Sequence, residues 1–106
     1  MSFKPKRLAW GALNATAGTS IYQLPRGKIA SLRVMRFHNS GGVTRIVKVA
    51  FNFGGTSVQF EYASLATHET LLIECGDILE GTDSIEAYQD AGTDVNFVIS
   101  GLLMDE

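Results

Sequence analysis

The chain has 106 residues, of which 45% are hydrophobic and 19% are charged, and its formal net charge is −2. This balance is typical of one globular domain, and it excludes a disordered tail and a collagenous repeat. The longest apolar stretches fall far short of the ~20 residues that a membrane helix needs, so we expect no membrane-spanning segment.

The first seven residues carry three positive charges and no negative charge. Lys4, Lys6 and Arg7 surround a proline, which holds the backbone extended. We expect an extended basic N-terminal arm over residues 1–7 and one folded domain over residues 8–106; the alternative is a frayed, solvated terminus. Because no apolar stretch follows these charges, the sequence predicts no secretory signal, and we expect synthesis in a cytosol.

After the arm, apolar residues recur at the period of two that is typical of β-strands. Leu8, Trp10 and Ala12 form the first such set, so we expect Trp10 to lie in the core; an interface hot spot is the alternative role for this tryptophan. A short strand over residues 21–24 follows, and a turn with proline and glycine ends it.

The next predicted strand is long and covers residues 29–38. Met35 and Phe37 form its inward pair. Arg33 and Arg36 fall on opposite faces under strict alternation, which indicates a β-bulge or a solvated face.

The middle of the chain predicts a hairpin that supplies much of the core. Two glycines in residues 39–42 form a loop before it, and a second Gly-Gly pair joins its strands. We expect the inward faces of its two strands to carry the following side chains: Val47, Val49, Phe51 and Phe53 on the first, and Val58, Phe60 and Tyr62 on the second.

Three further alternating sets follow, separated by glycine-containing loops. They begin at Leu71, Ile85 and Val95, and the last of them runs on to Met104. Together these runs make about eight short strands at a spacing of about 8 to 12 residues. The sequence therefore predicts an all-β fold: a single antiparallel β-sandwich or jelly-roll-like domain.

Charge is divided between the two halves of the chain. All nine basic residues lie within residues 4–48 and all eleven acidic residues lie within residues 61–106. One reading is that these charges pair across strands within one molecule. The other is that separate basic and acidic surfaces join neighbouring subunits of a homo-oligomer. The acidic half would repel phosphate, which argues against nucleic acid as a partner.

No set of residues has the spacing of an active site, a metal site or a cofactor site. His38 and His68 lack a partner at metal-ligand spacing, and Cys75 falls in an alternating run that favours a small buried side chain. Four aspartates near glycine-containing loops are expected to accept hydrogen bonds in turns rather than bind calcium: Asp77, Asp83, Asp90 and Asp94. We therefore expect a protein that is not an enzyme and has no cofactor.

Residues outside the alternating sets are the candidates for contact with a partner. Phe3 lies outside any predicted strand, and Met104 lies at the end of the last one. With the basic residues Lys4, Lys6 and Arg7 they form the predicted interface. A carbohydrate- or ligand-binding β module is the main rival, and it would require exposed aromatic side chains.

Several segments resemble the small virion proteins of tailed bacteriophages. Residues 21–30 match their aliphatic-Tyr-x-aliphatic-Pro-x-Gly-Lys strand and turn, and residues 37–42 match a strand that ends in Asn before a polar loop. Residues 64–71 are similar to their turn into a strand, and residues 95–101 to their closing strand. Residues 78–85 resemble a Leu-x-x-Gly-Asp corner, from which this chain departs by an inserted threonine.

The resemblance implies a structural protein of the virion without a cofactor, assembled in the host cytoplasm. A capsid decoration or cement protein is the favoured role, with the major capsid protein as its partner. A neck, tail, baseplate or fibre accessory protein is the alternative within the virion.

Overall fold

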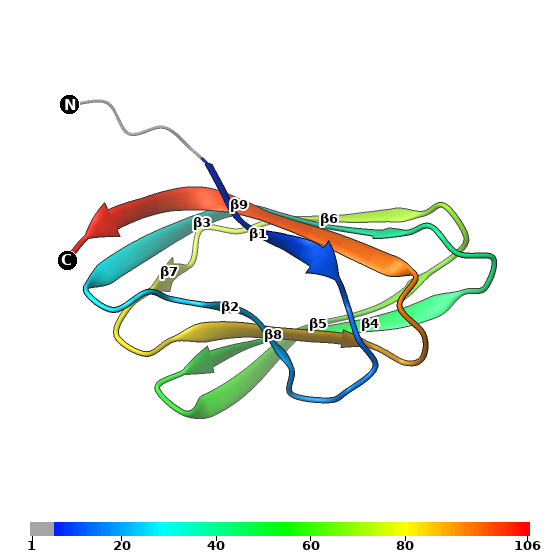
Figure 1. The fold of residues 1–106 in the computed structure, drawn as a ribbon, viewed down its shortest axis with the longest axis horizontal. Coiled ribbons are helices and arrows are strands. Elements are labelled where there is room, and N and C mark those ends of the chain that lie inside the picture. The colour runs from blue at the N-terminus through cyan, green and yellow to red at the C-terminus, as the bar shows by residue number, and fades with distance from the viewer. Residues whose placement is uncertain (1–5) are drawn as a thin grey trace.

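The computed structural model of the chain describes residues 6–106, and these residues form two antiparallel sheets that pack face to face (Figure 1). The strands are β1 (Lys6–Ala12), β2 (Ser20–Gln23), β3 (Lys28–Asn39), β4 (Arg45–Phe53), β5 (Thr56–Leu65), β6 (Thr70–Glu74), β7 (Ile78–Leu79), β8 (Ser84–Gln89) and β9 (Val95–Asp105). The predicted all-β antiparallel sandwich is confirmed. The short strand β7 brings the described strands to nine.

The two sheets have different strand orders. The first, called sheet A here, has the order β1-β9-β3-β6, with β7 also paired to β3. The second, called sheet B, has the order β2-β8-β4-β5. In both sheets, strands from the two ends of the chain lie side by side, so every surface of the sandwich combines distant parts of the sequence.

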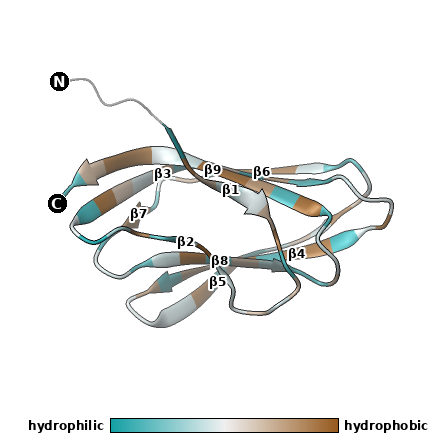
Figure 2. Ribbon diagram, in the orientation of Figure 1, coloured by the Kyte–Doolittle hydropathy of each residue, from teal (hydrophilic) through white to brown (hydrophobic). Residues whose placement is uncertain are grey.

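The core lies between the two sheets and is built by the alternating residues of the long strands. Met35 and Phe37 of β3 are fully buried, as predicted, and Val47, Val49 and Phe51 of β4 face them from sheet B. Figure 2 shows brown, hydrophobic colour over much of β9, in keeping with its apolar sequence.

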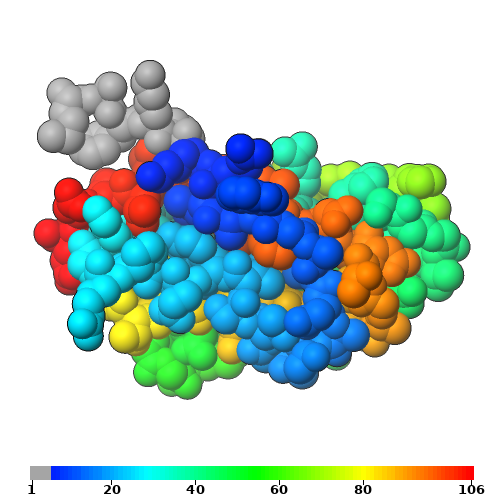
Figure 3. Space-filling model, viewed as in Figure 1, coloured from blue at the N-terminus to red at the C-terminus, as the bar shows by residue number. Residues whose placement is uncertain are grey.

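One side of the sandwich is closed by the crossing from β1 in sheet A to β2 in sheet B. Leu13 lies on this crossing with no exposed surface, and its N–H donates to the carbonyl oxygen of Val95 at 2.8 Å. Figure 3 shows residues of β1, β2 and the connection between them covering the space between the sheets on the side that faces the viewer.

A β-bulge changes the face to which two aromatic residues point. In β1 the register shifts between Arg7 and Ala9, so that Leu8 packs against the core and Trp10 points outward with 64% of its surface exposed. The prediction that Trp10 lies in the core is wrong, because the extra residue at the bulge inverts the alternation after it.

The same effect occurs in β5. Glu61 pairs with Val49 and Gln59 pairs with the next residue of β4, so that Phe60 is the extra residue. Phe60 stacks on Phe51 with ring centroids 4.3 Å apart, whereas Tyr62 lies on the outer face of sheet B and is 58% exposed. The predicted inward position of Tyr62 is therefore wrong.

Two further members of that hairpin are more exposed than predicted, for a different reason. Val58 lies opposite Phe51 on the inner side of sheet B, but β5 is an edge strand and Val58 is largely exposed. Phe53 is also partly exposed, at the end of β4. Of the two alternatives predicted for β3, a bulge or a solvated face, the bulge is present: the register shifts between Leu32 and Val34, around Arg33.

Buried polar side chains fasten the loops to the sandwich. Asn39 is fully buried at the end of β3: its Nδ2 donates to the carbonyl oxygens of Val43 (2.7 Å) and Leu65 (3.0 Å), and its Oδ1 accepts from the N–H of Gly41 (3.0 Å). This one amide therefore joins β3 to the β3–β4 loop and to the end of β5.

The aspartates of the loops act as hydrogen-bond acceptors. Asp83 is buried, and its carboxylate accepts from the N–H groups of Gly54 and Glu80, both at 3.0 Å. Asp90 accepts from the N–H of Ile46 at 3.0 Å. These contacts fit the turn-acceptor role predicted for them.

Candidate interaction surface

The outer face of sheet A is assembled from side chains that the strand register places in rows. One row of directly paired residues crosses the four strands of the order β1-β9-β3-β6: Trp10 of β1, Val98 of β9, Arg36 of β3 and Leu72 of β6. The neighbouring row contains Arg7, Ser100, Val34 and Glu74 in the same strand order. Because opposite residues in antiparallel strands share a face, each row is continuous across the sheet.

Large apolar side chains are exposed on this face. Trp10 is 64% exposed and Leu72 is 57% exposed, at the two edges of one row. Ile78 of β7 is 49% exposed and shares the face with Leu102 through their common neighbour Ser31. Scattered exposed apolar residues are ordinary, but a set that shares one sheet face makes that face the candidate for an interaction surface.

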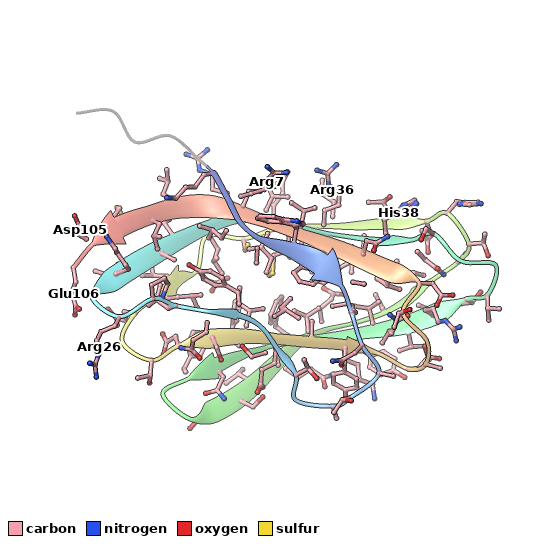
Figure 4. The ribbon with its side chains drawn as sticks, viewed as in Figure 1. Arg7, Arg26, Arg36, His38, Asp105 and Glu106 are labelled. Atoms are coloured by element: carbon pink, nitrogen blue, oxygen red, sulfur yellow. The ribbon has the colours of Figure 1, made fainter. Side chains whose placement is uncertain are left out.

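Positive charge accompanies the apolar side chains. Figure 4 shows Arg7, Arg36 and His38 pointing away from the sandwich on the side of sheet A. The Arg7 guanidinium lies over the Trp10 ring, 4.9 Å from its centroid. The two rows contain one acidic residue, Glu74, at the edge opposite Arg7.

Few of the described basic side chains form ion pairs within the molecule. In the part of the chain that the structure describes, basic and acidic side chains form two ion pairs: Lys28 with Asp105, and Arg45 with Asp94 at 3.3 Å. Arg7 and Arg36 are in neither pair. Pairing of the basic and acidic halves within one molecule thus accounts for two of the described basic residues.

The predicted interface residues fall in different places. Phe3 and Lys4 lie outside the described residues. Lys6 and Arg7, which the sequence analysis assigned to the arm, lie in β1 and pair with Gly101 and Ser100. Met104 is partly exposed in β9, opposite Ile29, in the part of the outer face beyond β1.

Sequence reasoning did not assign the apolar residues of this face to the predicted interface, and for Trp10 an interface role was the less favoured alternative. Leu72 lies between Leu71 and Ile73, and both of these pack against the core. Strict alternation along β6 therefore points Leu72 outward, and that signal was sufficient to find it. Trp10 carried no such signal, since its orientation depends on the bulge at Leu8.

The outer face of sheet B carries a second, more polar feature. Lys48 lies between two tyrosines of neighbouring strands, with its Nζ 5.3 Å from the ring centroid of Tyr62 and 5.5 Å from that of Tyr88. Beside it is a depression of about 200 Å³, lined among others by Gln59 and Glu86. The Glu86 carboxylate accepts from the Ser57 hydroxyl at 2.8 Å.

The side chains with chemical reactivity do not converge on a common site. His38 Nδ1 lies 2.7 Å from Thr70 Oγ1, and the His38 and His68 rings stack 6.4 Å apart. Cys75 follows β6, and its N–H donates to the carbonyl oxygen of Arg33. Arg33 lies on β3, five residues before His38. Burial, with a smaller contribution from the Asp77 carboxylate, raises the pKa of the Cys75 thiol, which disfavours the nucleophilic thiolate.

The described residues contain neither a metal-binding cluster nor a membrane-spanning helix. Within residues 6–106, no three side chains of the His, Cys, Asp and Glu types gather in a way that could hold a metal ion. No helix in that range is long and apolar enough to cross a membrane.

Comparison with known proteins relates this chain to others by shape. No protein-family model and no curated protein matches it. It is similar to a solved structure described as "Bacillus endospore appendages form a novel family of disulfide-linked pili", with a TM-score of 0.61 and 16% identity over 98% of this chain and 88% of that one. The likeness is one of fold. The globular domain of zebrafish complement 1qA protein has a TM-score of 0.40 and 14% identity, over 92% of this chain and 96% of that one.

Proposed function

We propose that this chain is a non-enzymatic structural subunit that associates with copies of itself through the outer face of sheet A. The observation that carries the proposal is the exposed apolar face, on which Trp10 and Leu72 stand at opposite edges of one row. Tryptophan and arginine are enriched at protein interfaces, and an exposed apolar face beside them is typical of an interaction surface. The separation of Cys75 from the histidines supports a non-enzymatic role.

The likeness of fold to a pilus protein is consistent with a subunit that assembles, and it supports the proposal at that level alone. For the setting, we propose the virion of a tailed phage, with the role of a capsid decoration protein on the major capsid protein. This part rests on the resemblance of residues 21–30, 37–42 and 95–101. A neck, tail or baseplate position is the alternative, and it makes the same demand for an assembling sandwich.

The proposal predicts a concentration-dependent oligomer. We expect size-exclusion chromatography with light scattering to show a defined oligomer in roughly 50 mM salt, where screening is weak. In roughly 1 M salt its dissociation constant should rise by about tenfold, because rim charges are screened while the apolar contact remains. A monomer at every concentration in both salts would contradict the proposal.

A second candidate function is ligand binding on the outer face of sheet B. The exposed ring of Tyr62 and the depression beside Glu86 supply the aromatic surface and polar groups that saccharide sites commonly combine. A glycan array probed with the protein tests this candidate. A saccharide whose binding is lost in both Tyr62→Ala and Glu86→Ala would support it, and an array without signal would remove it.

A further inference from the structure

We infer that two copies of the chain pack the outer faces of sheet A together about a two-fold axis that runs along the strands, and that Arg7 of each copy then meets Glu74 of the other. The inference rests on the proposed function and specifies its partner surface. A two-fold axis makes an interface in which the same patch contacts itself, so each contact occurs twice. The rows of the outer face decide which axis fits.

The strand order of sheet A makes the face self-complementary about this axis. In the order β1-β9-β3-β6, an axis that runs along the strands between β9 and β3 exchanges β1 with β6. Each row then faces the same row of the second copy in reverse order. Arg7 and Glu74 are the ends of one row, so Arg7 of one copy meets the opposite charge of Glu74 of the other. In the neighbouring row, Trp10 of one copy meets Leu72 of the other.

The charges favour this axis over the other two-fold axis in the plane of the interface, which runs across the strands. An axis across the strands would place β1 of one copy on β1 of the other. No position of that axis brings Arg7 opposite Glu74, and an axis through their row would place Arg7 on the second Arg7 and Glu74 on the second Glu74. Like charges brought together across an interface cost several kcal/mol, whereas opposite charges fix its register.

Arg36 is the charged residue nearest the middle of this arrangement. It lies between Val98 and Leu72 in its row, and β9 of the second copy faces it. The Trp10 ring of the second copy is on the next strand, facing Leu72. A guanidinium binds well on an aromatic face, as Arg7 already does on its own Trp10. The arrangement thus gives Arg36 an aromatic neighbour on one side and Arg36 of the second copy on the other. It brings one like-charged pair together at the centre of the interface and joins two opposite-charged pairs, Arg7 with Glu74, at its edges.

A charge exchange tests the pairing directly. Arg7→Glu alone places carboxylates together at both ends of the row, and Glu74→Arg alone places guanidinium groups together. We expect each variant by itself to have a dissociation constant raised by about tenfold or more in low salt. In an equimolar mixture of the two variants, both end contacts regain opposite charges, so a mixed dimer should form with an affinity within about threefold of the wild type.

The charge-exchange experiment needs a control variant in which a charge is reversed outside the outer face of sheet A. Arg26 lies in the turn after β2, at the end of the sandwich (Figure 4), and Arg26→Glu should leave association unchanged. Arg7 and Glu74 are exposed on edge strands, and thermal unfolding of each variant checks that the fold is retained. Sedimentation equilibrium then gives the dissociation constants of the wild type, the variants and the mixture.

The outcomes separate this inference from the proposed function. If the wild type associates but the mixture associates no better than either variant alone, the pairing of Arg7 with Glu74 is overturned while the structural-subunit proposal stands. If the wild type is a monomer at every concentration, both are overturned. Recovery in the mixture, with Arg26→Glu unaffected, supports the two-fold arrangement.

Discussion

Replacing Asn39 by alanine is expected to lower the free energy of unfolding by about 2–4 kcal/mol. The Asn39 amide is fully buried and makes three hydrogen bonds with backbone groups, at 2.7 to 3.0 Å. Alanine would leave the carbonyl oxygens of Val43 and Leu65 and the N–H of Gly41 without this partner. The contact with Leu65 is buried, and an unpaired buried backbone group costs about 1–3 kcal/mol. The contacts with Val43 and Gly41 are part-buried and add less, because water can replace the amide there.

Urea denaturation followed by circular dichroism measures this effect. Asn96→Ala is the matched control, because Asn96 is exposed on β9 and makes one long hydrogen bond, 3.4 Å, to Ser40. We expect the control to stay within about 0.5 kcal/mol of the wild type. A loss of less than about 1 kcal/mol in Asn39→Ala would mean that the amide does not hold these loops.

Replacing Trp10 by alanine is expected to weaken self-association by about 30-fold or more. Tryptophan is enriched among the residues whose truncation costs about 2 kcal/mol or more at an interface, and that energy corresponds to about 30-fold in the dissociation constant. Stability should change little, because Trp10 is 64% exposed within one molecule. Its contact with Arg7 is an exposed cation–π pair, worth about 0.5–1 kcal/mol.

The matched control for Trp10 is an exposed aromatic residue on the opposite sheet. Tyr62 is 58% exposed on the outer face of sheet B, where Lys48 lies over its ring. Tyr62→Ala should leave the dissociation constant unchanged if sheet A alone forms the interface. Equal weakening by both substitutions would contradict the assignment to sheet A.

Alternation predicted the fold and most of the core, and it failed where a bulge was invisible in the sequence. The bulge in β3 could be predicted because strict alternation would bury either Arg33 or Arg36, and burial of an unpaired charge is too costly. In β1 the choice lies between Leu8 and Trp10, both of which are acceptable in a core. Residues 8–12 contain no charged side chain that would make burial of one face of the strand costly, so the sequence does not indicate the bulge.

The candidate surface was harder to predict than the fold for a related reason. Alternation along β6 points Leu72 outward, but a single exposed apolar residue is ordinary, and its position becomes informative only beside its neighbours in the sheet. The row from Trp10 to Leu72 joins strands that are distant in sequence, through pairings set by turns and bulges. Arg7 was predicted as an interface residue from its charge, but its place opposite Glu74 follows from the strand order alone.

The outer face of sheet A can be observed directly through the fluorescence of Trp10, the single tryptophan of the chain. The measurement is the tryptophan emission maximum over a dilution series in low salt, with light scattering recorded on the same samples. If this face forms the interface, the emission maximum shifts to shorter wavelength as the oligomer forms, and both signals give one dissociation constant. An oligomer that forms while the emission stays at the wavelength of a water-exposed indole would contradict the assignment and place the interface elsewhere on the sandwich.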